Sequence, residues 1–282
     1  MVGITADEFT TKIIILGHGV AIAERFELSP GVTLEPDFPR VDIAAASASA
    51  RDFSDYAAAV TGGELATFSI EVQGGTGPEL VARAWNSLWL FHLLSLACSG
   101  PCYSLCAIAR GKTDRYSAAN RNVMFRPLPL IVSAASEQIA WAKGNLPGFH
   151  RLISEPVFGS AMRCYGNAHY LFDLDTRIML LWAGIEGLLS VDAELNRRLA
   201  LYAALLHKGS TAEKIAYFKE VKKAYAIRSR TVHGGKATAE MLRAGYQTSS
   251  NILVGLLVRC VELGRVPSTD ELDALAVSQS LA

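Results

Sequence analysis

A change in the spacing of proline and glycine divides the chain near its middle. The first part is interrupted by turn signals such as Ser29-Pro30-Gly31, with short apolar runs between them. From residue 148 to residue 265 the only proline is Pro156, and apolar residues recur with a helical period. Frequent turn signals indicate short strands, whereas a long proline-poor stretch indicates helices. The sequence therefore predicts an α+β protein, with a mixed α/β domain of unclear topology over residues 1–146 and an all-α bundle over residues 147–282.

Length and composition agree with two modest globular domains. The 282 residues are 50% hydrophobic and 19% charged, which is far from the composition of disordered chains. Lys plus Arg and Asp plus Glu are equal at 27 each, so the net charge indicates no class of partner. Residues 151–282 carry 16 basic and 13 acidic side chains, a slight excess that is compatible with an anionic ligand.

The sequence indicates neither export nor insertion into a membrane. The apolar run Ile13–Leu16 is too short for a signal peptide. The uncharged stretch Ala84–Ala109 is broken by Gly100-Pro101, which favours a buried helix followed by a strand over a membrane span. The five cysteines complete no pattern of zinc ligands. We therefore expect a cytoplasmic protein with reduced, buried thiols, no metal site and no cofactor.

Five helices are predicted in the second half from their apolar period and their capping residues. They cover Val157–Leu171, Asp173–Val191, Glu194–His207, Thr211–His233 and Thr238–Leu263. Asp173 or Asp175 is the expected N-cap of the second helix, and Gly234-Gly235 is expected to end the fourth. The buried face of the second helix is predicted to consist of Ile178, Leu181, Trp182, Ile185, Leu188 and Leu189.

The fourth helix carries the residues of greatest chemical interest. At about 100° per residue its apolar side chains align in one stripe. The stripe consists of Ile215, Phe218, Val221, Tyr225 and Val232. Arg228 and His233 border this stripe on opposite flanks, with Ser229 between them. The segment Lys208–Lys236 contains eight basic and two acidic side chains, so helix geometry alone favours a solvated, lysine-rich face with a capping histidine.

The string Tyr225–Gly234, YAIRSRTVHG, resembles the signature of HEPN domains, especially that of the Apea-like families. The signature is an arginine, a polar residue directly after it, and a histidine a few positions further on, often followed by glycine. Arg228, Ser229 and His233 occupy these places. The arginine-to-histidine motif is short and occurs by chance, so the resemblance also depends on the segments upstream.

Two upstream segments resemble further helices of the same family. Ile178–Ser190, with Glu186, is similar to the helix that bears a characteristic glutamate. Glu194–Leu206, with Arg198, is similar to the helix between the glutamate and the motif. The segments occur in the expected order, which strengthens the resemblance, but it does not extend to the first domain.

The resemblance implies a homodimer of helical bundles whose two Arg–His motifs face one cleft, and metal-independent RNA cleavage in the active members. In that reaction the RNA 2′-hydroxyl attacks the adjacent phosphorus. His233 is then expected to transfer protons near neutral pH. Arg228 is expected to bind the phosphate as its negative charge develops. Ser229 is expected to orient the substrate or the imidazole, and Glu186 to hydrogen-bond Arg228 or His233, or else to form a plain structural salt bridge.

Two functions of different classes follow. The first is an endoribonuclease with RNA as substrate, in a bacterial defence or toxin–antitoxin context and with a possible protein partner or antitoxin. The second is a non-catalytic HEPN module that binds nucleotide, RNA or a protein through the same cleft. The intact set of Arg228, Ser229 and His233 favours the first.

A third reading, as a minimal nucleotidyltransferase, is weaker. Gly159-Ser160 followed by Asp173 and Asp175 has the residue types that such an enzyme uses to bind metal and triphosphate. Paired carboxylates at the start of a predicted helix are already explained by the helix dipole, and the strand that such a site requires is not predicted here.

Overall fold

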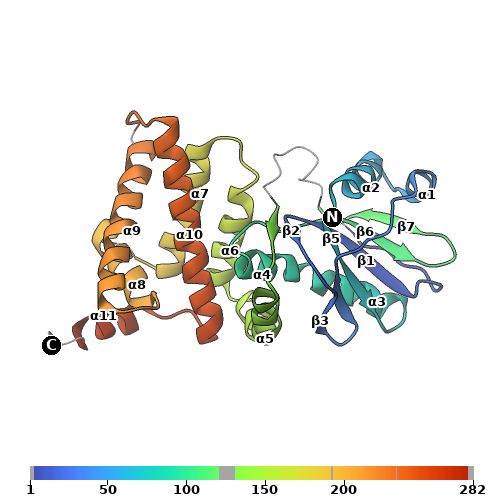
Figure 1. Ribbon diagram of the computed structural model, residues 1–282, viewed down its shortest axis with the longest axis horizontal. Coiled ribbons are helices and arrows are strands. Elements are labelled where there is room, and N and C mark those ends of the chain that lie inside the picture. Colours follow the sequence, from blue (N-terminus) through green and yellow to red (C-terminus); the bar gives the residue numbers. More distant parts are fainter. Residues whose placement is uncertain (1–2, 121–130, 192, 233, 279–282) are drawn as a thin grey trace. The chain divides into compact units, whose positions relative to one another are not determined.

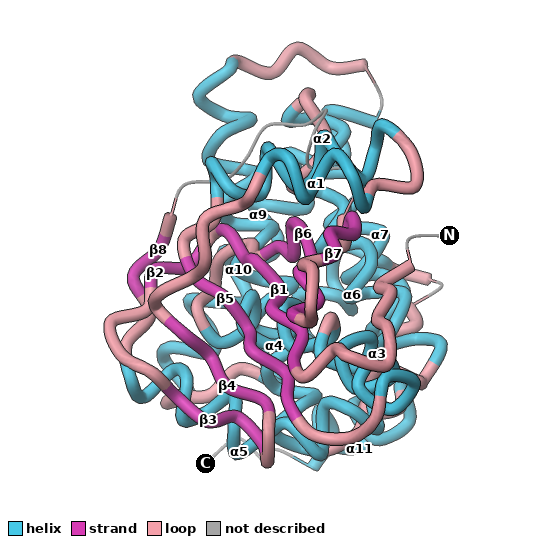
Figure 2. Tube along the Cα trace, turned by 90° about the vertical axis from the view of Figure 1, so that its right-hand side faces the viewer, coloured by secondary structure: helices cyan, strands magenta, loops and turns pink. Residues whose placement is uncertain are grey.

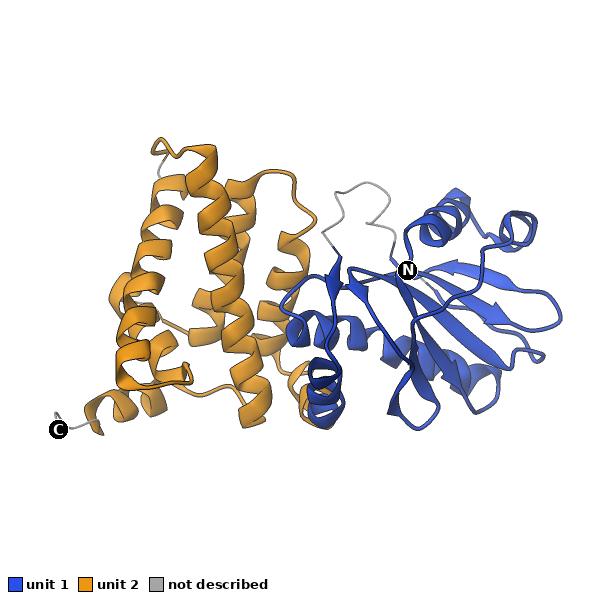
Figure 3. Cartoon of the chain, in the orientation of Figure 1, with its two compact units in different colours: residues 1–146 blue, residues 147–282 orange. Residues whose placement is uncertain are grey.

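The chain divides into two compact units, residues 1–146 and residues 147–282 (Figure 3). The computed structural model describes residues 3–120, 131–191, 193–232 and 234–278. Unit 1 holds an antiparallel sheet with helices, and unit 2 is helical in all of its described regular elements. The predicted α+β class is therefore confirmed. In the described part of the chain, no helix is both long enough and apolar enough to cross a membrane.

Every strand pairing in the main sheet of unit 1 is antiparallel. Figure 2 draws the strands in magenta. Its strands are β1 (Lys12–His18), β3 (Phe26–Ser29), β4 (Val32–Glu35), β5 (Phe68–Gln73), β6 (Tyr103–Arg110) and β7 (Arg115–Ala118). They lie in the order β3-β4-β5-β1-β6-β7. The short strands β2 (Val20–Ala21) and β8 (Val132–Ser133) form a separate parallel pair. Strand β1 is central and almost wholly buried, as its isoleucine run requires.

Four helices accompany this sheet. They are α1 (Ile43–Ser49), α2 (Phe53–Leu65), α3 (Gly77–Ser87) and α4 (Trp89–Ala97). Helix α2 packs against β6 and β7, and α3 packs against β1 and β5 on the other side of the sheet (Figure 1). The buried carboxylate of Asp55 ties α2 to β7, because it accepts the backbone N–H of Ala118 at 3.0 Å. The same carboxylate pairs with Arg51, just before α2, at 2.7 Å.

Unit 2 is a helical bundle in which the five predicted helices all form. They are α6 (Pro156–Ala168), α7 (Leu174–Leu189), α8 (Leu195–Leu206), α9 (Thr211–Val232) and α10 (Ala239–Leu263). Helix α5 (Ser136–Leu152), which contributes to both units, and α11 (Thr269–Ser278) were not predicted. Asp173 and Thr238 are N-caps, and Thr238 Oγ1 accepts the N–H of Met241 at 3.2 Å. Helix α9 ends as expected, since Gly234 adopts a φ of 70°.

Helix α7 is central to the bundle and contacts α6, α8, α9 and α10. Its six predicted core residues are all buried. The Trp182 indole is fully buried and donates Nε1–H to Ser249 Oγ of α10 at 2.9 Å. Gly184 permits a close approach of two helices, because an added Cβ would lie 2.9 Å from Cys164 Cβ and 3.0 Å from Leu253 Cδ2. These contacts fix α7, and with it the position of Glu186.

Candidate functional site

Helix α9 directs Arg228 toward the interior of unit 2. Val221 and Ala224 are the buried residues of this helix. Arg228 follows Ala224 by one turn on the same side, and its side chain is only 21% exposed. The predicted apolar stripe is therefore wrong in part, since Ile215 and Val232 are exposed. The packed face of α9 therefore runs through Val221, Ala224 and Arg228.

Arg228 forms an ion pair with Glu186 of α7. Nη2 of Arg228 lies 3.0 Å from Oε1 of Glu186 and donates a hydrogen bond to Oε2 at 3.3 Å. Both carboxylate oxygens thus approach the same nitrogen, instead of one oxygen meeting each of two nitrogens as in a parallel fork. The pair joins two predicted site residues that lie 42 positions apart in sequence.

Burial of this pair is incompletely compensated. Nε of Arg228 is buried and has no hydrogen-bond partner among the described residues. Oε1 of Glu186 is also buried, and its contact with Nη2 at 3.0 Å is an ion pair without hydrogen-bond geometry. Desolvation raises the pKa of the Glu186 carboxyl above its ordinary value, and the nearby charge of Arg228 opposes that rise only in part. A half-satisfied buried pair is costly for the fold, and such pairs concentrate at functional sites.

Aromatic side chains hold the guanidinium in place. The Arg228 guanidinium carbon lies 5.5 Å from the centroid of the Tyr225 ring, within the range of a cation–π contact. Tyr225 in turn meets the buried Trp182 edge-on, with ring centroids 5.1 Å apart. Since Trp182 is anchored to Ser249, a chain of contacts connects the bundle core to Arg228. Arg228 is therefore positioned by packing as well as by charge.

The remaining predicted site residues differ in their placement. Ser229 is half-buried, and it makes no hydrogen bond to the side chains of Arg228 or Glu186 in the part of the chain that the structure describes. His233, the expected proton-transfer residue, lies outside the described residues. Thr231, which sequence analysis did not single out, donates its hydroxyl to the backbone oxygen of Arg228 at 2.7 Å. This bond within one turn is a common local motif of Ser and Thr in helices.

Arg198, which the family resemblance also marked, belongs to a different cluster. It donates Nη2–H to Asp273 of α11 at 3.1 Å and Nε–H to the hydroxyl of Tyr202 at 3.1 Å. Tyr202 also donates to Asp273. These contacts attach α11 to α8, which is a structural role.

The local structure contradicts the interpretation of this chain as a nucleotidyltransferase. Gly159 and Ser160 lie within helix α6, and Asp173 and Asp175 lie at the start of α7. No strand is present between them to align the carboxylates with a Gly-Ser loop. Among the described residues, no group of three or more His, Cys, Asp or Glu side chains is arranged to hold a metal ion.

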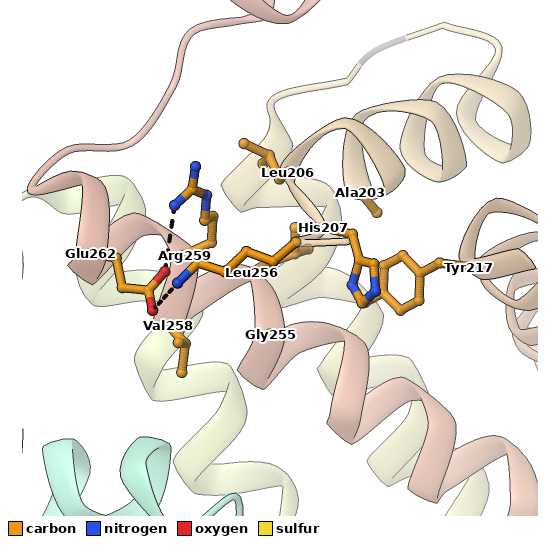
Figure 4. A pocket seen from close by; sticks show the side chains of 10 residues that line it. Ala203, Leu206, His207, Tyr217, Gly255, Leu256, Val258, Arg259 and Glu262 are labelled. Atoms are coloured by element: carbon orange, nitrogen blue, oxygen red, sulfur yellow. Dashed lines mark hydrogen bonds and ion pairs between the residues drawn. The ribbon is translucent and has the colours of Figure 1, made fainter. Parts of the chain in front are cut away.

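A separate small cavity lies where α8, α9 and α10 meet (Figure 4). Its volume is about 170 Å³, and on one wall the ring of His207 stacks on Tyr217 with centroids 4.2 Å apart. Glu262 binds both cations of its rim, Lys208 at 2.7 Å and Arg259 at 3.5 Å. Because one carboxylate engages both cations, this cavity suits a phosphate less well than the surroundings of Arg228.

Comparison of the chain with protein-family models, with curated proteins and with solved structures finds no match. The assignment of a function therefore depends on the geometry around Arg228 and on the sequence motif that contains it.

Proposed function

We propose that unit 2 is a HEPN-type endoribonuclease that cleaves RNA without metal, through attack of the 2′-hydroxyl on the adjacent phosphorus. One observation carries the proposal. The bundle brings Glu186 and Arg228 into direct contact at 3.0 Å, and these residues come from two different segments that resemble HEPN domains. Glu186 engages Nη2 of Arg228 and Nε is buried, so the partly exposed guanidinium keeps Nη1 as its donor for a second anion. The phosphate of RNA is the anion that this reaction requires.

Arg228 is assigned to the phosphate and Glu186 to the position of Arg228. A guanidinium that is oriented before the substrate binds stabilises the charge of the pentacoordinate phosphorus without reorganisation in the reaction step. Glu186 acts through Arg228, so it is a positioning residue. His233 is assigned to proton transfer on chemical grounds, because imidazole both accepts and donates a proton near neutral pH.

The direct test is an incubation of the full chain with four substrates: RNA, RNA with EDTA, DNA, and RNA carrying 2′-O-methyl groups. We expect cleavage of the first two only, with a 2′,3′-cyclic phosphate on the product, since the nucleophile is the tethered 2′-hydroxyl. Loss of cleavage with EDTA and its recovery with Mg²⁺ would overturn the metal-free route. Cleavage of DNA would overturn the 2′-hydroxyl route.

Three variants assign the activity to this site. Arg228→Ala and His233→Ala should each reduce kcat by about 100-fold or more. Arg228→Lys should also lose most activity, while its retained charge preserves the ion pair with Glu186. Arg230→Ala is the matched control, because Arg230 is an exposed arginine on the same helix. Equal loss of activity in Arg230→Ala would contradict the assignment.

The proposal includes a homodimer through unit 2, with two Arg228 motifs contributing to one cleft. A single guanidinium pairs with phosphate from one side, and the second motif supplies the opposite side. Light scattering at micromolar concentration should give twice the monomer mass. An active enzyme that is monomeric at the concentrations of the assay would exclude the shared cleft.

A further inference from the structure

An open pocket adjoins the Arg228 site where helix α8 begins. It is lined by Ala193, Glu194, Leu195, Asn196, Arg197 and Tyr225, and has a volume of about 680 Å³. Tyr225 belongs both to this pocket and to the contact with the Arg228 guanidinium. One aromatic ring, that of Tyr225, thus contacts both the pocket and the proposed cleavage site.

The Tyr225 ring is held firmly but is not enclosed. The edge-on contact with Trp182, at 5.1 Å between centroids, fixes its orientation from the core side. Its side chain is only half-buried, and its hydroxyl makes no hydrogen bond to any described residue. A fixed and partly open aromatic ring provides a surface on which a nucleobase can stack, and stacking of this kind accepts any base.

The rim of the pocket supplies polar groups suited to a nucleotide. Asn196 is exposed and offers both an amide donor and an amide acceptor. The Arg197 side chain is 77% exposed, and its contact with Glu194 is 4.0 Å long. Ion pairs that are this long and solvated contribute little, so the guanidinium can leave Glu194 for a phosphate. The Glu194 carboxylate, 67% exposed, is the opposing charge on this rim.

We propose that this pocket binds the nucleotide next to the scissile phosphate, with its base stacked on Tyr225 and its phosphate contacted by Arg197. The inference rests on the proposed ribonuclease function and adds two binding residues to it. In this arrangement the Tyr225 ring contacts both the Arg228 guanidinium, which it orients, and the nucleobase, which stacks on it. Arg197, from a different helix, gives the RNA a second cationic contact and fixes its register relative to Arg228.

The test separates binding from cleavage in the full-length protein. The probe is a fluorescein-labelled RNA oligonucleotide made uncleavable by 2′-O-methyl groups, titrated in fluorescence anisotropy. Arg197→Ala should weaken binding about 3- to 10-fold and reduce the slope of log affinity against log salt by about 0.7. Tyr225→Leu should weaken binding about 10-fold, while Tyr225→Phe, which keeps the ring, should stay within about twofold of wild type. Arg163→Ala, an exposed arginine on α6, should bind as wild type does.

A second readout reports stacking itself. 2-Aminopurine placed beside the mapped cut should be quenched on binding to wild type and to Tyr225→Phe. The quench should be lost in Tyr225→Leu, and circular dichroism checks that this variant is folded. If it is not folded, the binding of Arg197→Ala and the quench with wild type test the proposed nucleotide site instead. If wild type cleaves RNA but Arg197→Ala binds normally and no quench occurs, this inference fails and the ribonuclease stands. If wild type neither binds nor cleaves RNA, the proposed function itself fails.

Discussion

Both carboxylate oxygens of Glu186 converge on a single nitrogen, Nη2 of Arg228, at 3.0 and 3.3 Å. The pair therefore holds Arg228 without occupying its full set of donors. A structural ion pair that maximised its own stability would use two nitrogens in parallel. The observed arrangement suits a cation that exchanges part of its contact for a ligand.

This geometry makes the two residues thermodynamically coupled. Arg228→Met should lower the free energy of unfolding by about 1–3 kcal/mol, because it leaves a partly buried Glu186 carboxylate without its counterion. Adding Glu186→Gln should restore part of that loss. Urea unfolding followed by far-UV circular dichroism gives the coupling energy from the double-mutant cycle. Strictly additive losses would show that the pair does not interact in solution.

Glu186→Gln alone should separate positioning from phosphate binding. The amide keeps the size of the side chain and an oxygen that accepts from Nη2, but it removes the charge. We expect kcat to fall about 10-fold with KM equal to or below that of wild type, since a negative charge beside the phosphate site is lost. The pKa of Glu186 is raised by burial, so the carboxyl contributes a step to the acid side of the kcat profile. That step should be missing in Glu186→Gln; an unchanged profile would remove Glu186 from the site.

Two glycines on α7 give a test of the packing that positions Glu186. Gly184→Ala should lower the free energy of unfolding by about 1 kcal/mol or more, because the new Cβ would lie 2.9 Å from Cys164 Cβ. Gly187→Ala is the matched control, since nothing lies within 4 Å of its added Cβ. There we expect a gain of about 0.5–1 kcal/mol from helix propensity. Thermal unfolding of both variants measures these changes in stability. Equal changes in Gly184→Ala and Gly187→Ala would mean that α7 is not tightly packed at Gly184.

A buried histidine in unit 2 makes stability fall in acid. His169 is 6% exposed, Nδ1 is hydrogen-bonded to the Tyr246 hydroxyl, and Nε2 has no partner among the described residues. Burial, aided by the charge of Arg177, lowers the pKa of His169 from 6.5 to about 4. The unfolded chain therefore takes up this proton first as the pH falls. The stabilisation is complete above about pH 6.5 and is lost between about pH 6.5 and about pH 4, by roughly 3 kcal/mol in all.

The check is the pH dependence of urea unfolding in His169→Gln, whose side chain cannot take up that proton. Its stability should fall less than that of wild type between about pH 7 and about pH 5. His150→Gln, at an exposed histidine of α5, should keep the wild-type dependence. Identical slopes in all three proteins would exclude His169 as the cause.

The sequence was sufficient for five helices of unit 2, α6 to α10, because their signals are local. Caps such as Asp173 and Thr238, and the stop at Gly234, lie next to the residues that they govern. Helix α5 was not predicted because it contains Pro147, and a proline inside a helix usually interrupts it. The order of strands in unit 1 depends on pairings between distant segments, such as Lys12 with Gln73, and no local pattern encodes that order.

The site itself was predictable only in part. The motif selected Arg228 and Glu186, and the structure brings their side chains together. The burial of Arg228 was not predicted, because the helical period placed Arg228 on the flank of the apolar stripe, outside its packed face. Ile215 instead lines a groove beside Leu201 and Leu205 of α8. The pocket at Arg197 was also missed, since it depends on how α8 and α9 pack against each other.

The sparse burial of α9 has a consequence for hydrogen exchange. Of its 22 residues Val221 and Ala224 are buried, whereas ten residues of α10 are buried. Free energies of local opening follow the density of buried contacts. The amides around Arg228 should therefore exchange through an opening that leaves α7 and α10 intact, and an anion bound at Arg228 should slow that exchange. Arg228 thus lies on a sparsely buried helix of unit 2, where a bound ligand can increase the protection of the backbone amides most.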